Sequence, residues 1–307
     1  MKSKKYLKRM IPLSLRRFRS VWIDRMALSK MPVLFCDASP LATLDRNSPD
    51  SIFHAKELDE EWKTVEAEIA SLAITDKASG VNPGDRRAIY YLIRRLKPRS
   101  VLEIGTHIGA STVHIATALR TLRAKEPSSS VRLVSIDICD VNDPASAPAL
   151  KFGSRYTPLE MMNKIRCDDC VEFVTDSSLN YFSKCDRYYD AIFLDGDHAA
   201  ATVYREIPAA LKLLSRGGYI LLHDYFPYLR PLWPDGALIP GPYLATQRLT
   251  QEGADIQIAP LGKLPWPTKQ DSNVTSLALV TRSGTPVNKA SRVAHEHDTS
   301  VIHHPVV

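Results

Sequence analysis

Two short runs of acidic and imidazole side chains carry the functional groups best suited to ligand binding and proton transfer. One is DGDH, which ends at His198, and the other is HD, which begins at His223. Each run follows an apolar segment, residues 189–194 and 219–222, that predicts a buried strand. A helix is predicted over residues 200–214 between them. An open parallel sheet binds ligands at the carboxyl ends of its strands, so we expect both runs to line one site.

A third stretch, RSVLEIGTHIGAST at residues 99–112, predicts a strand over 100–104, a glycine turn and the start of a helix at Ser111. Such a turn lets the backbone approach a ligand closely, and the free N–H groups of the helix favour an anionic or carboxylate-bearing group. The spacing G-x-x-x-G differs from the dinucleotide fingerprint G-x-G-x-x-G, which disfavours an NAD-dependent oxidoreductase. The alternative is an ordinary strand-to-helix turn that uses glycine for packing.

The next predicted strand, residues 131–136, ends at Asp137. In nucleotide-binding folds an acid at this place binds both ribose hydroxyls, because one carboxylate can accept two hydrogen bonds. We therefore predict a ribose contact for Asp137, with a solvated residue at the strand end as the alternative.

The elements that must position these residues follow an α/β pattern. Helices are predicted over residues 58–72, 83–96 and 244–251, and further strands over 170–175, 254–259 and 276–281. Five strands alternate with helices and a strand pair closes the sheet. We therefore predict a Rossmann-like doubly wound α/β domain over residues 51–282. A basic extension and linker at 1–50 precede it, and a disordered tail at 283–307 follows it.

The positive charge of the chain is concentrated at its N-terminus. The net charge is +6, and residues 1–30 hold ten Lys or Arg against one acid, which leaves 30 basic and 33 acidic residues in the remainder. The remainder therefore has a net charge of −3, which argues against a domain that binds nucleic acid.

The same basic segment has apolar residues on one helical face: Ile11, Leu15, Phe18 and Trp22. Such a helix suits the surface of an anionic membrane, so we predict peripheral membrane contact through residues 1–30. A helix that packs on the domain and a cleaved transit sequence are the alternatives.

The five cysteines are odd in number and scattered, which does not suggest a disulfide framework. The sequence has no run of about 18 apolar residues, and the basic start is not followed by the apolar core of a signal peptide. We therefore predict a cytoplasmic protein, associated with a membrane at most at its periphery.

Taken in order, five motifs resemble those of class I S-adenosylmethionine (SAM) dependent methyltransferases: EIGTHIGAST, SIDI, FVTDSS, LDGDH and GGYILLHDY. They lie within about residues 83–282. Within the class, the sequence resembles most the metal-dependent O-methyltransferases that include macrolide-sugar and cephalosporin-type enzymes. The resemblance implies a seven-stranded, mostly parallel sheet with an antiparallel last strand, and SAM as the cofactor.

The resemblance also implies roles for individual residues in binding SAM. The residues implied around its methionine part are Glu103, Gly105, Thr106, Gly109 and Ser111. Asp137 takes the ribose, Asp176 and Ser177 lie on the adenine side, and Asp195 lies close to the transferred methyl group.

For catalysis, the resemblance implies His198 as the general base and Asp195, His223 and Asp224 as ligands of a divalent metal, Mg²⁺ or Mn²⁺. A histidine can take the proton of a hydroxyl group, and a bound divalent ion would lower the pKa of that hydroxyl. The similar enzymes carry an acid where this chain has His223. Fe²⁺ therefore also comes into consideration, as does a site without metal. His198 could instead cap a helix or contact SAM.

These features predict an O-methyltransferase that acts on a hydroxyl of a small molecule, sugar or glycolipid. A SAM-binding scaffold without activity, or an N-methyltransferase with another acceptor, is the alternative. LDGDH is not the N/D-P-P-Y type segment of nucleic-acid amino-methyltransferases, so no nucleic-acid substrate is expected. The sequence leaves the oligomeric state open and allows a homo-oligomer.

Overall fold

A seven-stranded sheet forms the centre of the computed structural model, which describes residues 12–282 apart from 44–51, 77, 79, 129 and 270. The strand order is β3-β2-β1-β4-β5-β7-β6. The strands are β1 Ser100–Ile104, β2 Arg132–Asp137, β3 Val171–Thr175, β4 Tyr189–Leu194, β5 Leu214–Leu222, β6 Ile256–Pro260 and β7 Ala278–Arg282. β1 to β5 pair in parallel, and β7 pairs antiparallel with both β5 and β6. The predicted fold class is confirmed.

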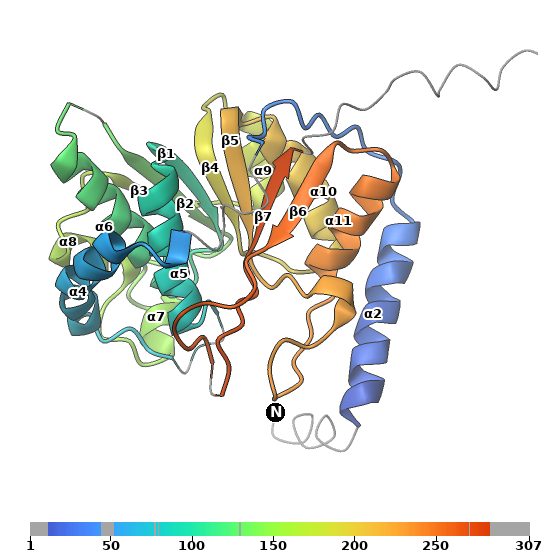
Figure 1. Cartoon of the computed structure of the whole chain (residues 1–307), viewed down its shortest axis with the longest axis horizontal. Coiled ribbons are helices and arrows are strands. Elements are labelled where there is room, and N and C mark those ends of the chain that lie inside the picture. Colours follow the sequence, from blue (N-terminus) through green and yellow to red (C-terminus); the bar gives the residue numbers. More distant parts are fainter. Residues whose placement is uncertain are drawn as a thin grey trace, which may run out of the picture.

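Helices cover both faces of the sheet (Figure 1). One face carries α4 Lys56–Ser71, α5 Pro83–Leu96, α6 Ala110–Lys125, α7 Pro148–Lys151 and α8 Pro158–Lys164. The other carries α2 Leu13–Ser29, α9 Ser178–Lys184, α10 Ala200–Leu211 and α11 Gly241–Gln251, with a short 3₁₀ turn, η1, at Pro227–Leu229. The helix predicted in the basic segment is thus α2, and it packs on α10 and α11.

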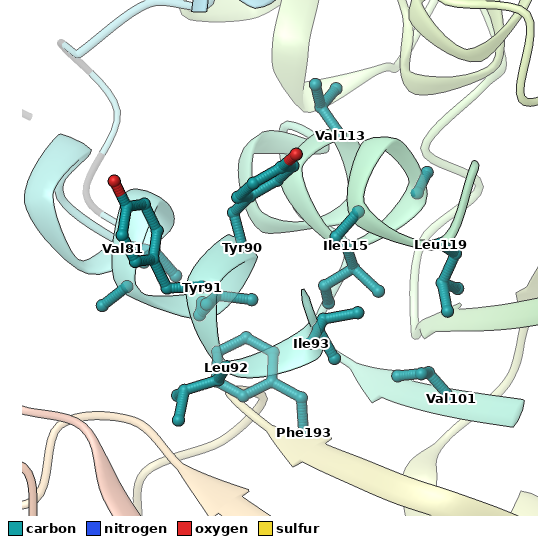
Figure 2. Packing of buried hydrophobic residues seen from close by; sticks show 14 of the residues in the cluster. Val81, Tyr90, Tyr91, Leu92, Ile93, Val101, Val113, Ile115, Leu119 and Phe193 are labelled. Atoms are coloured by element: carbon teal, nitrogen blue, oxygen red, sulfur yellow. The ribbon is translucent and has the colours of Figure 1, made fainter. Parts of the chain in front are cut away.

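Each face of the sheet has its own buried apolar cluster, because side chains alternate along a strand. In β1, Val101 joins the cluster under α5 and α6, whereas Leu102 and Ile104 join the cluster under α10. Figure 2 shows Ile93 of α5 and Ile115 of α6 close to the sheet at Val101. This packing fixes α5 and α6 against the strand whose end carries the glycine turn.

The prediction differs from the structure most at residues 212–218. We predicted a helix that continues to residue 214, but α10 ends at Leu211 and β5 begins at Leu214. Gly217 has a φ of 81°, and a Cβ on Gly218 would lie 2.8 Å from the backbone oxygen of Asp190. The glycines therefore allow a close approach to β4, where the strand register shifts between Tyr189 and Ala191.

The described part of the predicted linker lies along the sheet. Leu41 forms a bridge with Gly218, and the backbone N–H of Arg282 donates to the oxygen of Ala42 at 2.9 Å. Residues 1–11, the rest of the linker at 44–50, and the predicted tail at 283–307 lie outside the described residues. No helix in the described part of the chain is long and apolar enough to cross a membrane.

Candidate active site

A cavity of about 850 Å³ lies at the carboxyl ends of β1, β2, β4 and β5, a size typical of small-molecule sites. Its wall contains eight of the predicted site residues: Gly105, Asp137, Asp176, Ser177, Asp195, His198, His223 and Asp224. The two acid and imidazole runs therefore meet in one place, as the order of the strands predicted. Four other predicted residues do not line this cavity: Glu103, Thr106, Gly109 and Ser111.

Gly105 allows the ends of β1 and β4 to approach each other. Its φ is 97°, and a Cβ at this position would lie 2.3 Å from the backbone oxygen of Asp195. The backbone N–H of Asp195 in turn donates to the oxygen of Ile104 at 2.9 Å. Gly105 therefore places the glycine turn directly beside the acid that follows β4.

Glu103 is a buried carboxyl group behind the glycine turn, and it stabilises the turn through hydrogen bonds. It accepts hydrogen bonds from the hydroxyls of Ser111 at 2.5 Å, Thr112 at 2.6 Å and Ser135 at 2.6 Å. Burial raises the pKa of Glu103 to about 7, although the three hydroxyls act in the opposite direction. Its side chain thus joins β1 to β2 and to the start of α6.

For four residues of the turn, Glu103, Thr106, Gly109 and Ser111, the SAM contacts stay predictions, and the structure shows which contacts these residues make within the protein. The hydroxyl of Ser111 is used by Glu103, and the hydroxyl of Thr106 lies 2.6 Å from that of Ser135. Gly109 has a φ of 77°, and a Cβ there would lie 3.0 Å from Pro158, so it serves the turn and its packing. Together with Glu103, these residues shape the wall from behind.

Asp137 is oriented by the backbone of two loops. Its Oδ2 accepts from the N–H of His107 at 2.8 Å, and its Oδ1 accepts from the N–H of Cys139 at 3.0 Å. Each carboxylate oxygen has a second lone-pair site, so both oxygens can still accept a hydrogen bond from a ligand. The ribose contact of Asp137 stays a prediction, and the two backbone hydrogen bonds leave room for it.

The wall near β3 holds Asp176 and Ser177, and it adds a carboxyl group that the sequence analysis missed. Asp176 accepts from the side chain of Asn180 at 2.7 Å, and this hydrogen bond lowers the pKa of Asp176. Glu206 of α10 is almost fully buried and accepts from the hydroxyl of Ser178 at 2.5 Å. Burial raises the pKa of Glu206 to about 7. No pattern in the sequence separates Glu206 from other residues of an amphipathic helix.

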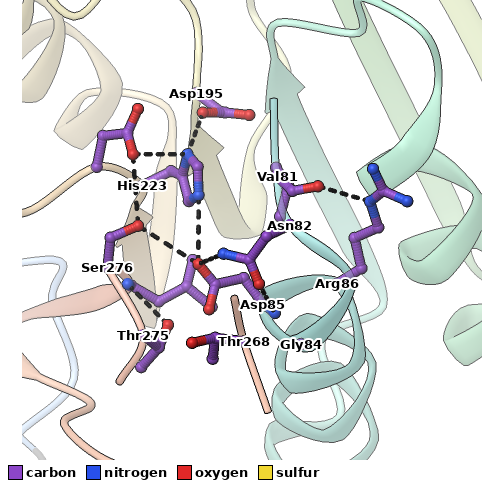
Figure 3. Close-up of polar contacts among 12 residues, drawn as sticks. Val81, Asn82, Gly84, Asp85, Arg86, Asp195, His223, Thr268, Thr275 and Ser276 are labelled. Atoms are coloured by element: carbon purple, nitrogen blue, oxygen red, sulfur yellow. Dashed lines mark hydrogen bonds and ion pairs between the residues drawn. The ribbon is translucent and has the colours of Figure 1, made fainter. Parts of the chain in front are cut away.

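His223 is buried between carboxylates on both sides of its ring (Figure 3). Its Nδ1 lies 2.7 Å from Oδ1 of Asp195, and its Nε2 lies 3.4 Å from Oδ2 of Asp85. Burial by itself lowers the pKa of His223. The charges of Asp195 and Asp224 and the hydrogen bonds outweigh burial, so the pKa lies well above its usual value. The acids around His223 therefore favour the protonated form of its ring.

Asp85 is the second residue that the sequence analysis missed. It is fully buried in the first turn of α5, where its N–H donates to the side-chain oxygen of Asn82 at 3.0 Å. Its carboxylate accepts from the amide of Asn82 at 2.8 Å and lies 3.4 Å from the hydroxyl of Ser276. In the sequence, N-P-G-D is a helix start and nothing more, because the partners of Asp85 in the site are far along the chain.

His198 lies at the cavity wall with 29% of its side chain exposed. Its Nε2 is 3.5 Å from Oδ2 of Asp224 and 3.7 Å from Oδ1 of Asp195. Asp224 has a φ of 53°, a left-handed conformation that few residues other than glycine adopt. The hydroxyl of Ser276 lies 3.4 Å from its carboxylate. The strained backbone thus directs the carboxylate toward His198.

The predicted metal ligands Asp195, His223 and Asp224 do not fit a metal site. In the ranges that the structure describes, no group of three or more His, Cys, Asp or Glu side chains is arranged to hold a metal ion. The physical reason lies in His223, because its Nδ1 faces the carboxylate of Asp195 and its Nε2 faces that of Asp85. We therefore derive no step that uses a metal at these residues.

Comparisons with known proteins found one family match and several similar solved structures. Residues 102–225 match a family model described as "Methyltransferase domain". Among solved structures, an O-methyltransferase from Bacillus cereus in complex with SAH is 18% identical, with a TM-score of 0.47, covering 79% of this chain and 98% of that one. The O-methyltransferase TomG from Streptomyces achromogenes, involved in tomaymycin synthesis and in complex with SAM, is 16% identical, with a TM-score of 0.46 and coverages of 87% and 99%.

A search of the curated proteins found no match. The matched residues run from β1 to the end of the HDY run after β5, and so contain the cavity residues of all the parallel strands. Residues 102–225 are therefore similar to a methyltransferase domain, and the sheet that contains them has the strand order β3-β2-β1-β4-β5-β7-β6.

Proposed function

We propose that this methyltransferase transfers the methyl group of SAM to a hydroxyl of a small molecule, sugar or glycolipid, with His198 as the general base. The main support is the position of His198 at the cavity wall, 3.5 Å from Asp224 and 3.7 Å from Asp195. A neutral imidazole can accept the proton of an attacking hydroxyl, and neighbouring carboxylates stabilise the imidazolium that forms. The base and its charge partners therefore lie in one wall.

The residues of the cavity fit SAM as the methyl donor. Asp137 can accept both ribose hydroxyls, and Asp176 and Ser177 offer polar groups on the adenine side. The several acids of the wall suit a ligand with a positive sulfonium. When bound, SAM supplies an electrophilic methyl group for an in-line displacement. The protein must then align the acceptor oxygen and remove its proton.

His223 contacts the two acids, Asp195 and Asp224, that the metal was expected to bind. Its ring fixes Asp195 on one side and faces Asp85 on the other, so Asp195 keeps one orientation beside His198. Asp195 and Asp224 thereby stabilise the positive charge that His198 gains when it accepts the proton. In this proposal the hydroxyl is activated by a base alone, without a metal ligand among these residues.

The first test is a calorimetric titration of S-adenosylhomocysteine into the full chain. We expect binding that is strongly weakened in Asp137→Ala. Formation of S-adenosylhomocysteine from SAM is then measured with panels of hydroxyl and amine acceptors, for the wild type, His198→Ala and the control His54→Ala. His54 is exposed and outside the cavity.

Turnover with a hydroxyl acceptor that is lost in His198→Ala but kept in His54→Ala supports the proposal. Binding of S-adenosylhomocysteine without turnover on any acceptor would favour the inactive scaffold, and turnover confined to amines would favour N-methylation. No binding by folded protein contradicts the proposal altogether.

A further inference from the structure

Helix α2 anchors itself to the domain with polar side chains on its inward side and exposes several large apolar side chains on its outward side, where an ordinary surface helix carries polar residues. The side facing the domain consists of half-buried or buried positions at a three- and four-residue spacing: Arg17, Ser20, Val21, Asp24, Ala27 and Leu28. Leu28 is the one buried residue of this described helix. The outward side holds the large apolar side chains Leu15, Phe18, Trp22 and Met26, which are 55%, 68%, 55% and 42% exposed.

The inward side is fixed by specific polar contacts. Arg17 Nε donates to the backbone oxygen of Gly236 at 2.8 Å, and Asp24 accepts from the N–H of Ala200 at 3.1 Å. Behind the helix, Arg248 of α11 donates to the backbone oxygens of Leu28 and, at 2.8 Å, Met31. The orientation of α2 is therefore set, and the outward exposure of Phe18 and Trp22 follows from it. Figure 1 shows α2 at the outer edge of the molecule, beyond α10 and α11.

The charges on the outward side have one sign. Arg16, Arg19 and Arg25 are exposed, whereas Asp24, the only acid of the helix, is turned to the domain. The preceding residues 1–11 add five more Lys or Arg in sequence and no acid. An apolar stripe with aromatic residues and flanking arginines matches the boundary between lipid headgroups and acyl chains. Two copies of the chain paired through this face would bring like charges together, which disfavours a dimer there.

We propose that the outward face of α2, defined by Leu15, Phe18, Trp22 and Met26 with Arg16, Arg19 and Arg25, docks the protein on an anionic phospholipid bilayer. The apolar side chains enter the headgroup region and the arginines contact lipid phosphates. The helix contacts Gly236, in the loop that reaches the cavity at Ile239, and Ala200, two residues after His198. Docking would therefore bring the cavity-lining elements close to the membrane surface, independently of which acceptor is methylated.

The experiment is sedimentation of the full chain with vesicles of phosphatidylcholine alone and of phosphatidylcholine mixed with phosphatidylserine. We expect binding only to the mixed vesicles and weaker binding at high salt. Phe18→Ser/Trp22→Ser should lower the partition coefficient at least about tenfold, because it removes the two aromatic anchors. Arg16→Gln, Arg19→Gln and Arg25→Gln should each lower it about fivefold.

The matched control is Leu159→Ser, an equally simple change at an exposed apolar residue of α8 on the other face of the sheet. It should bind vesicles like the wild type, and all variants should keep the melting temperature and the S-adenosylhomocysteine affinity. Binding that persists in Phe18→Ser/Trp22→Ser, or equal binding to both kinds of vesicle, would overturn the proposal. So would a dimer in analytical ultracentrifugation that the double variant dissociates while vesicles capture nothing.

Discussion

The carboxyl groups on and behind the two sides of the cavity have different kinds of partner. Under the glycine turn, Glu103 is surrounded by three hydroxyl donors, and Asp137 is held by two backbone N–H groups. At the ends of β4 and β5, the acids surround two imidazole rings instead. Hydroxyl and amide donors keep their protons over the whole physiological pH range, whereas imidazoles exchange theirs. The hydroxyls and amides of the first side are therefore fixed donors, and the imidazole side can take part in proton transfer.

Removing the general base, His198, should give the largest effect of all the changes. This effect should be confined to turnover, which depends on the imidazole side. His198→Ala is expected to lower kcat by about 10²–10⁴-fold, as is typical for the loss of a general base. The affinity for S-adenosylhomocysteine should stay within about twofold, because that ligand needs no proton transfer. Steady-state kinetics and calorimetry on the same preparation measure both quantities. An equal loss of affinity and turnover would make His198 a binding residue and remove the contrast between the two sides.

On the other side, Glu103→Ala should act on stability. The change leaves a cavity and three buried hydroxyls without their acceptor, which is expected to cost about 3 kcal/mol in the free energy of unfolding. Chemical denaturation measures the loss. Glu103→Gln is the matched variant, since it keeps the volume but cannot ionise.

The glutamine variant also tests the protonation of Glu103. With a pKa raised to about 7, the folded protein binds more protons than the unfolded chain between about pH 4.5 and 7. This group therefore makes the wild type less stable as the pH rises through that window. Glu103→Gln should remove this part of the pH dependence while S-adenosylhomocysteine still binds. Loss of binding in the folded glutamine variant would return Glu103 to the ligand contacts.

These two sides also differ in how far the sequence could predict them. The turn at Gly105, the acid at Asp137 and the run that includes Asp195 were found because each follows a short apolar strand, and parallel strand ends meet at one edge. The role of Glu103 could not be found, because its three donors come from two different elements that only the packing of α6 on the sheet brings together. The motif suggested a ligand contact, which stays a prediction, and the structure shows Glu103 buried among these three hydroxyls.

The imidazole side depends on contacts that are even further apart in sequence. Asp85 starts α5, which precedes the first strand, and its partners His223 and Ser276 lie more than a hundred residues later. No local pattern connects them, so a metal was expected where the structure places His223 among carboxylates. The outward direction of Phe18 and Trp22 could not be predicted from the sequence for the same reason. The helical face was predicted, but only the contacts of Arg17 and Asp24 show which way it points.

Asp137→Ala should show that the fixed side carries the cofactor affinity. Removing a charged acceptor of two ligand hydroxyls is expected to weaken S-adenosylhomocysteine roughly 10- to 100-fold. Calorimetry gives the affinity, and Asp168→Ala, an exposed acid outside the cavity, serves as the control. If both variants bind equally well, Asp137 only caps the two loops that donate to it.

The smallest expected effect is the one that isolates the charge of Asp85. Asp85→Asn keeps the shape and can still contact His223, but it removes one of the carboxylates that hold the imidazolium. The pKa of His223 is raised in the folded state, so its stabilisation is fully present below about pH 6.5 and is lost as the pH rises through the raised pKa. The variant should therefore be less stable by about 1 kcal/mol below pH 6.5. This deficit in stability should shrink as the pH rises, because the wild type then loses the proton on His223 that Asp85 stabilises.

Thermal unfolding of both proteins across this pH range measures the difference in stability, with Asp168→Asn as the control. A deficit that stays constant with pH would mean that Asp85 serves only the start of α5, and that the two sides of the cavity differ less in their response to protons than their contacts indicate.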